Sequence, residues 1–147
     1  MMQLRMKQTD EYERLVKFFV EQGLEFNGDE EVDTDIIRCY KVTHGNEDHL
    51  VGGFVIAKRE GEYIIDGIAV EPIYRKMQIG KIMLEKAVKV VKELGGNRIY
   101  LVARAPGFFR KYGFVSIEPE DAPNFFECKQ CPQFQKTCHP EVMKLEM

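Results

Sequence analysis

Residues 63–94, with the sequence YIIDGIAVEPIYRKMQIGKIMLEKAVKVVKEL, constrain the fold more than any other stretch of the chain. An apolar run typical of a β-strand passes through a loop beginning at Pro72 and becomes an amphipathic helix. We predict that helix over 79–94, because apolar residues recur there at three- and four-residue spacing and Gly95 with Gly96 supplies a C-terminal stop. The start of a helix leaves backbone N–H groups unpaired and concentrates partial positive charge. A strand, a loop and a helix in this order therefore predict a diphosphate site at the helix entrance.

Basic residues surround that entrance. Arg75 and Lys76 lie in the loop, and Lys81 lies in the first turn of the helix. A helix packed on a sheet normally carries charge on its outer face, which is enough to explain the later lysines. It does not explain the cations gathered around the first turn, whereas a bound phosphate does.

These residues resemble the signature of the GNAT superfamily of acyl-CoA N-acyltransferases. That signature is Arg or Gln, two residues, Gly, one residue, then Gly or Ala, between the fourth strand and the third helix. Residues 75–80, RKMQIG, match its first and last positions and depart at Gln78, where the family usually has Gly. A later block at 108–114, FFRKYGF, resembles the family's F-Y-x-K-x-G-F. The resemblance covers residues 66–114 in good register and the ends of the chain more loosely.

Composition indicates one soluble globular domain over residues 1–147, because 44% of the residues are hydrophobic and 31% are charged. A net charge of −3 gives no support for general binding to nucleic acid. The chain shows no run apolar enough to span a bilayer and no signal-peptide core, so we expect a cytoplasmic protein without a membrane partner. The sequence leaves open whether the chain forms a homodimer.

The apolar runs predict a mixed α+β fold, which for the resembled family is a mostly antiparallel central β-sheet flanked by helices. Asp10 and Glu13 form a capping box for a first helix that ends near Gly23. A turn around Gly45 and Asn46 joins the second and third strands in a hairpin. The predicted strands cover residues 2–7, 36–43, 49–58, 63–70, 98–103, 114–117 and 141–147, and a short helix covers 106–112.

The resemblance implies acetyl-CoA as co-substrate and a primary amine as acceptor. An amine attacks a thioester only when neutral, so a proton acceptor must lie near it. Asp66 is the candidate base: on a regular strand it shares a face with Ile64 and Ile68, and apolar surroundings raise the proton affinity of a carboxylate. Alternatively, Asp66 and Gly67 mark a β-bulge at which the side chain ties down the backbone.

A second group must supply a proton to the departing thiolate of coenzyme A. Many members of the resembled family use a Tyr in the F-Y-x-K-x-G-F block, but Phe109 stands there and has no proton to give. Tyr112 is the candidate acid; the alternative is a core aromatic beside Gly113, with water supplying the proton.

The resemblance also implies the contacts to acetyl-CoA. The main chain of the fourth strand holds the pantetheine arm, the loop and helix entrance bind the pyrophosphate, and an aromatic ring packs against the arm. The matching positions are Ile68, Ala69, Val70, Arg75, Lys76, Met77, Gln78, Ile79, Gly80, Lys81 and Phe109.

The acceptor is suggested by the block at 108–114. Preceded by Ala105 and Pro106, it looks more like the acetyltransferase domains of bacterial N-acetylglutamate synthases than like protein N-terminal acetylases. This favours an amino acid or similar small amine, with Arg38 and Arg104 as candidates for binding its carboxylate. The acidic segment 25–35 is either a solvated loop or short helix, or a border of the acceptor site that attracts a cationic amine.

The C-terminal segment 124–147 contains a Cys128-x-x-Cys131 pair followed by Cys138 and His139. Three thiolates and an imidazole could complete a tetrahedral zinc site, with Cys39 as a substitute fourth ligand. Reduced structural or redox-sensitive thiols are the other interpretation.

Three functions therefore compete. The first is an acetyl-CoA-dependent N-acetyltransferase, favoured by the strand, basic loop and helix. The second is a sensor that binds acyl-CoA without turnover, suggested by the departures at Gln78 and Phe109. The third is a metal- or redox-responsive interaction module built on the cysteines.

Overall fold

The computed structural model describes residues 4–22, 35–44, 49–59, 61–103, 106–118 and 141–147, with the backbone alone at residues 35 and 75–77. Its elements are β1 (Leu4–Thr9), α1 (Tyr12–Glu21), β2 (Asp35–His44), β3 (His49–Arg59), β4 (Glu62–Val70), the 3-10 helix η1 (Pro72–Met77), α2 (Ile79–Glu93), β5 (Arg98–Ala103), α3 (Pro106–Arg110), β6 (Val115–Ser116) and β7 (Glu141–Glu146). This order agrees with the predicted one, except that the predicted loop after Pro72 forms a 3-10 helix.

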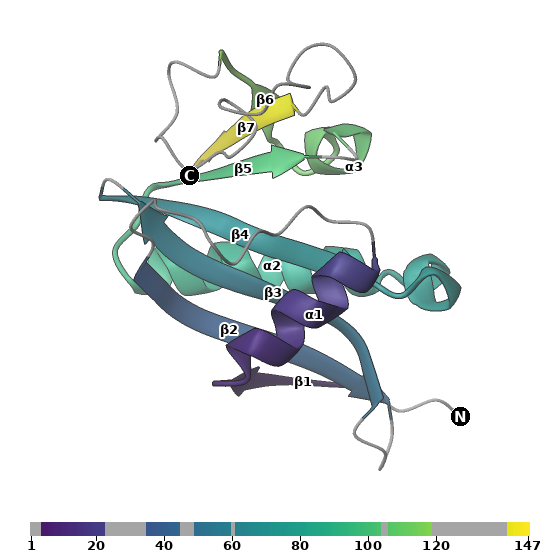
Figure 1. Cartoon of the computed structure of the whole chain (residues 1–147). Coiled ribbons are helices and arrows are strands. Elements are labelled where there is room, and N and C mark those ends of the chain that lie inside the picture. The colour runs from purple at the N-terminus through teal and green to yellow at the C-terminus, as the bar shows by residue number, and fades with distance from the viewer. Residues whose placement is uncertain (1–3, 23–34, 45–48, 60, 104–105, 119–140) are drawn as a thin grey trace, which may run out of the picture.

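The strands form one seven-stranded sheet in the order β1-β2-β3-β4-β5-β7-β6 (Figure 1). Every neighbouring pair is antiparallel except β4 and β5, which are parallel. The C-terminal strand β7 lies between β5 and β6, which sequence order alone does not predict. The expected mixed, mostly antiparallel sheet is confirmed.

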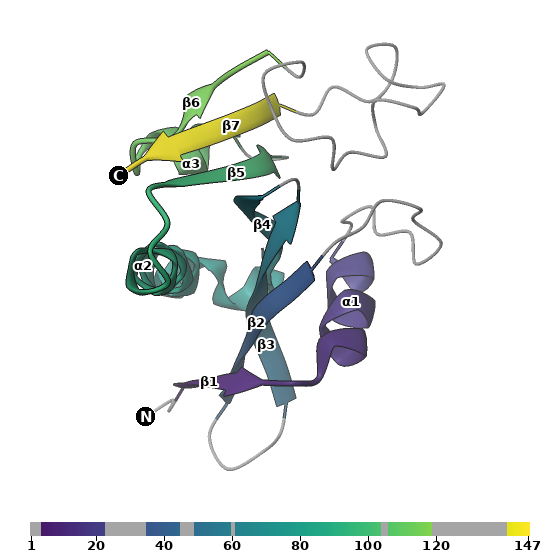
Figure 2. The same ribbon diagram turned by 90° about the vertical axis from the view of Figure 1, so that its left-hand side faces the viewer.

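Helices α1 and α2 lie on opposite faces of the sheet (Figure 2). The core on the α2 side is the larger, and we call it the α2-side core; its members include Val51, Phe54, Ile56, Met83 and Val90. The α1-side core consists of Leu15, Phe18, Phe19, Cys39, Leu50 and Val55. Each side chain of the sheet can therefore be assigned to one of two faces.

Helix α2 forms because its apolar positions fall on one side. The side chains buried there are Ile79, Met83, Leu84, Ala87, Val90 and Val91. Its end is the predicted glycine stop: Gly95 has a φ of +89°, and the Gly96 N–H donates to the Val91 carbonyl at 2.8 Å. A Cβ atom on Gly96 would lie 2.7 Å from the ring of Tyr63, so no larger residue fits.

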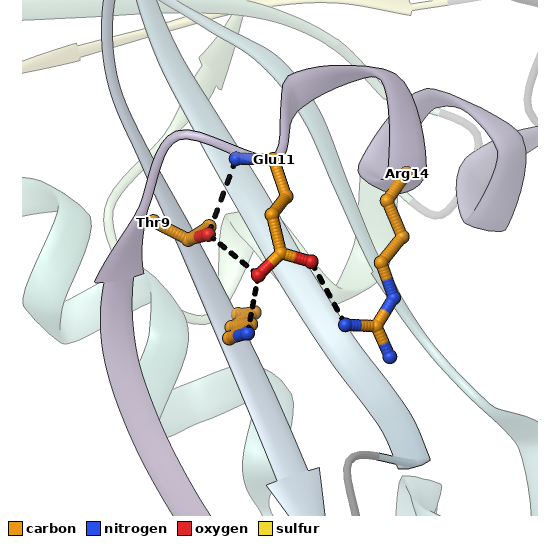
Figure 3. A network of polar contacts seen from close by, with 4 residues as sticks. Thr9, Glu11 and Arg14 are labelled. Atoms are coloured by element: carbon orange, nitrogen blue, oxygen red, sulfur yellow. Dashed lines mark hydrogen bonds and ion pairs between the residues drawn. The ribbon is translucent and has the colours of Figure 1, made fainter.

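The start of α1 differs from the predicted capping box of Asp10 and Glu13, which is wrong. Glu11 precedes the helix and makes no side-chain cap; instead, its N–H donates to Thr9 Oγ1 at 3.2 Å (Figure 3). The Glu11 carboxylate binds Arg14 of α1 and Lys41 of β2. Tertiary ion pairs thus replace the local cap and tie α1 to the first two strands.

The described helices include none that is both long enough and apolar enough to cross a bilayer.

Candidate active site between β4, α2 and α3

Strands β4 and β5 separate toward their C-terminal ends (Figure 1). In the part of the chain that the structure describes, their register joins them only at Ile64, near the start of β4, and Tyr100, midway along β5. Along the same length β4 stays paired with β3 on its other side, as far as Val70 opposite Gly52. The later part of β4 therefore has no ladder partner in β5, and an extended chain could add along that edge.

A β-bulge interrupts β4 at Asp66. Val55 of β3 pairs with Gly67 and the next residue, Ile56, pairs with Ile65, so Asp66 is the extra residue. This confirms the bulge that the Asp66-Gly67 pair suggested. The expected common face of Ile64 and Ile68 is wrong, because a bulge reverses the alternation of a strand. Ile68 packs on the α2-side core, whereas Ile64 packs on the other face with Ala57 and Tyr100.

The Asp66 side chain lies among polar groups on the α1 side of the sheet and is 12% exposed. Tyr12 Oη donates a long hydrogen bond to Asp66 Oδ2 at 3.5 Å. Arg59 Nη2 lies 4.0 Å from Oδ1, and the Arg59 side chain is 1% exposed. Because burial weakens solvent screening, this guanidinium favours an ionised carboxylate. The predicted apolar surroundings of Asp66 are thus a mixed environment containing a buried cation.

Cys39 lies close to the same carboxylate. It pairs with Val55, which pairs in turn with Gly67, and its side chain is buried. Burial, followed by the charges of Asp66 and Asp10, raises the pKa of the Cys39 thiol to about 11. The thiol therefore stays protonated at neutral pH, which makes it a poor nucleophile and a poor metal ligand.

The predicted zinc ligands Cys128, Cys131, Cys138 and His139 lie outside the described residues, as do Arg104 and the acidic segment up to residue 34. Within the described ranges, no group of three or more His, Cys, Asp or Glu side chains could hold a metal ion. The substitute ligand Cys39 thus has no partner set there.

The entrance of α2 has an unusual backbone at Gln78. Its φ of 59° and ψ of 24° are left-handed, and it is the one non-glycine residue with positive φ in the described part of the chain. This conformation favours glycine, which explains the Gly of the family signature at this position. The first bond within the helix runs from the Ile82 N–H to the Gln78 carbonyl at 3.2 Å, and no side chain caps this end. The amides of Ile79, Gly80 and Lys81 therefore point out of the helix, as anion binding requires.

Helix α3 reaches this entrance through Phe108. A Cβ atom on Gly80 would meet Phe108 Cζ at 3.2 Å, so the ring lies directly against the first turn of α2. Phe109, the ring expected to pack on the cofactor, is 6% exposed and lies in the α2-side core beside Phe114. Tyr112 is half-buried, with its ring 5.2 Å from that of Phe108. The aromatic residue at the entrance is therefore Phe108, not Phe109.

The remaining predicted positions lie in β4, η1 and β2. Strand β4 ends with Ile68, Ala69 and Val70, and the following 3-10 helix η1 includes residues 75–77. Arg38 pairs with Ile56 of the α2-side core, on the face opposite to Tyr12 and Asp66. It is therefore on the wrong side of the sheet to bind an acceptor beside Asp66. Sequence reasoning missed Tyr12 and Arg59 beside Asp66 and Phe108 beside Gly80, since no spacing rule brings these segments together.

Comparisons with known proteins agree with this geometry. The model of the acetyltransferase (GNAT) family matches residues 7–114. An uncharacterized N-acetyltransferase of Chlorobaculum tepidum is 34% identical over 71 residues, which cover 47% of this chain and 46% of that protein. The match thus spans about half the length of that relative.

Solved structures with the same fold cover nearly the whole chain. A GNAT-family acetyltransferase of Staphylococcus aureus Mu50 superposes with a TM-score of 0.72 at 17% identity, covering 98% of this chain and 99% of that one. N-acetylglutamate synthase of Neisseria gonorrhoeae, in complex with coenzyme A and N-acetyl-glutamate, gives a TM-score of 0.67 at 14% identity, over 99% of this chain and 35% of that one. At these identities the likeness establishes the fold.

Proposed function

Because the chain belongs to the GNAT family of acetyltransferases, we propose that it transfers an acetyl group from acetyl-CoA to a primary amine of an amino acid or another small molecule. The observation that carries this proposal is the junction of β4 and α2. An extended edge without a partner in β5 leads through η1 to an uncapped helix entrance. The two parts suit the two halves of coenzyme A, an extended arm and a pyrophosphate.

The pyrophosphate would be held by the outward amides of Ile79, Gly80 and Lys81, with Arg75, Lys76, Met77 and Gln78 forming the approach. The pantetheine arm would run along the main chain of Ile68, Ala69 and Val70. Phe108 replaces Phe109 as the aromatic wall, because its ring reaches Gly80. This assignment keeps the predicted backbone contacts and changes one side chain.

Asp66 is the proposed general base. The amine nitrogen attacks the thioester carbonyl, the C–N bond forms, and the carboxylate accepts the proton that nitrogen loses. Backbone N–H groups of β4 stabilise the negative charge on the carbonyl oxygen. The C–S bond then breaks, and the thiolate takes a proton from Tyr112 or from water. Asp66 lies in β4, just before the segment of that strand expected to hold the thioester, so its position suits this role.

The proposed acceptor, an amino acid or similar small amine, is inferred from the sequence of residues 108–114, and a structural neighbour supports it. That neighbour, N-acetylglutamate synthase, is solved with coenzyme A and an acetylated amino acid. Acceptors would approach Asp66 from the α1 side of the sheet, because Tyr12 of α1 contacts the same carboxylate.

A panel of amino acids and small amines tests the proposal. The protein is mixed with acetyl-CoA and each amine, released thiol is measured, and the acetylated amine is identified by mass spectrometry. We expect one thiol per acetylated amine, and a kcat lower by about 10²–10⁴-fold in Asp66→Asn, which keeps the shape and removes the base. Binding of acetyl-CoA without thiol release from any amine would favour the sensor instead.

Zinc at Cys128, Cys131, Cys138 and His139 remains a prediction, as do a homodimer and a cytoplasmic location. Metal analysis of freshly purified protein tests the zinc prediction. One zinc per chain, lost in Cys128→Ser, would support the site; a metal-free protein would leave the reduced-thiol interpretation.

A further inference from the structure

We infer that Tyr12 and Arg59 are positioning residues that hold Asp66 at the β4 bulge as a charged, oriented carboxylate. The inference rests on the proposed function, in which Asp66 accepts the proton of the amine. It assigns roles to two side chains that the sequence motifs do not include, and it places the base of the candidate site where α1, β3 and β4 meet.

The bulge makes such positioning necessary. Asp66 is the extra residue of the bulge, so the regular alternation of the strand does not fix where its side chain points. Its two oxygens face two different donors, with Tyr12 Oη at 3.5 Å from Oδ2 and Arg59 Nη2 at 4.0 Å from Oδ1. Contacts to both oxygens set the plane of the carboxylate. The distances are long, as they often are in a site without substrate, and contacts of this kind tighten when substrate binds.

Arg59 acts through Asp66 and not on the acceptor. With 1% of its side chain exposed, it has no surface to offer a substrate. Its buried charge favours the ionised form of Asp66, and only that form can accept a proton. The strand that carries Arg59 is the same β3 that pairs with the bulge, so the cation and the carboxylate are fixed to one framework.

Tyr12 places the carboxylate relative to the reacting strand. It packs against the α1-side core together with Ala69, which belongs to the part of β4 expected to hold the thioester. Its position at the start of α1 is fixed by Glu11, whose carboxylate binds Lys41 on β2. A hydroxyl at this place orients Asp66 toward an acceptor that enters from the α1 side.

The other charged or titratable groups near Asp66 come from the neighbouring elements. Cys39 of β2 faces it as a protonated thiol, and Asp10, before α1, also acts on that thiol. Lys41, Arg14 and Glu11 form a separate group, in which the Glu11 carboxylate pairs with both cations. The buried guanidinium of Arg59 is a cation that lies 4.0 Å from the Asp66 carboxylate.

Titration of Asp66 followed by carbon NMR tests the inference without any turnover. Protein labelled at aspartate carboxyl carbons is titrated, and the Asp66 resonance is assigned by its loss in Asp66→Asn. We expect the midpoint to move up by about one pH unit in Arg59→Met, by less in Tyr12→Phe, and hardly at all in Arg59→Lys. Unchanged midpoints in folded Arg59→Met and Tyr12→Phe would overturn the inference. If Arg59→Met does not fold, Arg59→Gln replaces it as the variant that removes the charge, with the same expected rise of the midpoint, and an unchanged midpoint there and in Tyr12→Phe would overturn the inference.

The pH profile of kcat/KM gives the second readout. The acidic limb should move up with the NMR midpoint in each variant, while the KM for acetyl-CoA stays unchanged. Two controls remove similar contacts elsewhere: Tyr63→Phe loses a hydroxyl bond to the Leu94 carbonyl, and Arg98→Met loses an ion pair to Glu62. Equal effects of the controls on the profile would contradict the inference. A wild type that never turns over would reject the proposed function, whereas the NMR midpoints would still judge the positioning roles.

Discussion

Phe108 and Gly80 touch across two helices, with 3.2 Å between Phe108 Cζ and the place of a Cβ on Gly80. This contact brings α3 onto the first turn of α2, where the amides point outward. The neighbouring ring, Phe109, meets the ring of Phe108 edge-on at 5.1 Å and packs on its buried side against Phe114 at 5.6 Å. Two adjacent phenylalanines thus have different surroundings, one at the proposed cofactor corner and one in the core.

Leucine at each of these positions should separate the two roles. Phe108→Leu should weaken acetyl-CoA binding about 5–10-fold, because it removes aromatic area from the wall of the corner. Phe109→Leu should lower the free energy of unfolding by about 1–2 kcal/mol and leave affinity unchanged, because the ring is buried. Calorimetric titration and denaturant unfolding measure the two effects. The reverse pattern would show that Phe109 is the ring at the cofactor.

Glycine at position 78 should stabilise the protein. The left-handed backbone of Gln78 costs about 1–2 kcal/mol for an L-residue, and glycine would remove this cost. Glycine also has greater conformational freedom in the unfolded chain, which offsets part of the stabilisation. We therefore expect Gln78→Gly to raise the free energy of unfolding by about 0.5–1 kcal/mol. Glu85→Gly, on the exposed side of α2, should lower it by about 1 kcal/mol. If both variants are destabilised alike in urea, the backbone of residue 78 is not left-handed in solution.

Glu11 should make stability depend on pH. Lys41, and then Arg14, hold the pKa of its carboxyl at about 2, below its ordinary 4.5. Because the folded-state pKa is the lower one, the stabilisation is present above about 4.5 and is lost as pH falls toward about 2. Glu11→Gln should therefore lower Tm near neutral pH, and its deficit relative to wild type should shrink through that window.

The matched control for this effect is Glu13→Gln, which changes an exposed carboxylate in the same first turn of α1. Its Tm should differ from that of wild type much less at every pH. A Glu11→Gln deficit that stays constant from neutral to acidic pH would contradict the ion pairs of Figure 3.

Cys39 should resist alkylation. Its buried thiol has a pKa raised to about 11, with Asp66 a larger cause than Asp10. In native protein treated with iodoacetamide at mildly alkaline pH, we expect the Cys39 peptide to stay unmodified. Labelling should be faster in Asp10→Asn and fastest in Asp66→Asn, as peptide mass spectrometry would show. Equal rates in the three proteins would indicate that neither carboxylate acts on the thiol.

The order of helices and strands could be predicted because it depends on local patterns. Apolar spacing placed α2 and β5, and the glycines after α2 marked its end. The face on which Asp66 lies could not be predicted, because a single inserted residue in β4 reverses the alternation. The predicted capping box of Asp10 and Glu13 was wrong because the helix is preceded by Glu11, whose carboxylate pairs with Arg14 and Lys41 and makes no side-chain cap.

The backbone part of the candidate site was within reach of sequence reasoning, whereas its side chains were not. A strand, loop and helix in succession identify main-chain groups around Gly80 regardless of which residues carry them. Tyr12 and Arg59 reach Asp66 from α1 and β3, and only the pairing of the sheet brings these segments together. The choice between Phe108 and Phe109 depends on how α3 is rotated, which a helix of five residues does not reveal in its sequence.

Calorimetric titration of acetyl-CoA into wild type, Gly80→Gln and Gly80→Glu tests the central claim most directly. Both variants press equally on Phe108, so their difference isolates the negative charge beside the outward amides. We predict that wild type binds, that Gly80→Gln binds more weakly, and that Gly80→Glu binds at least about tenfold more weakly than Gly80→Gln. Equal affinities of the folded Gln and Glu variants, or no binding by wild type, would contradict the claim that the amides at the start of α2 hold the pyrophosphate.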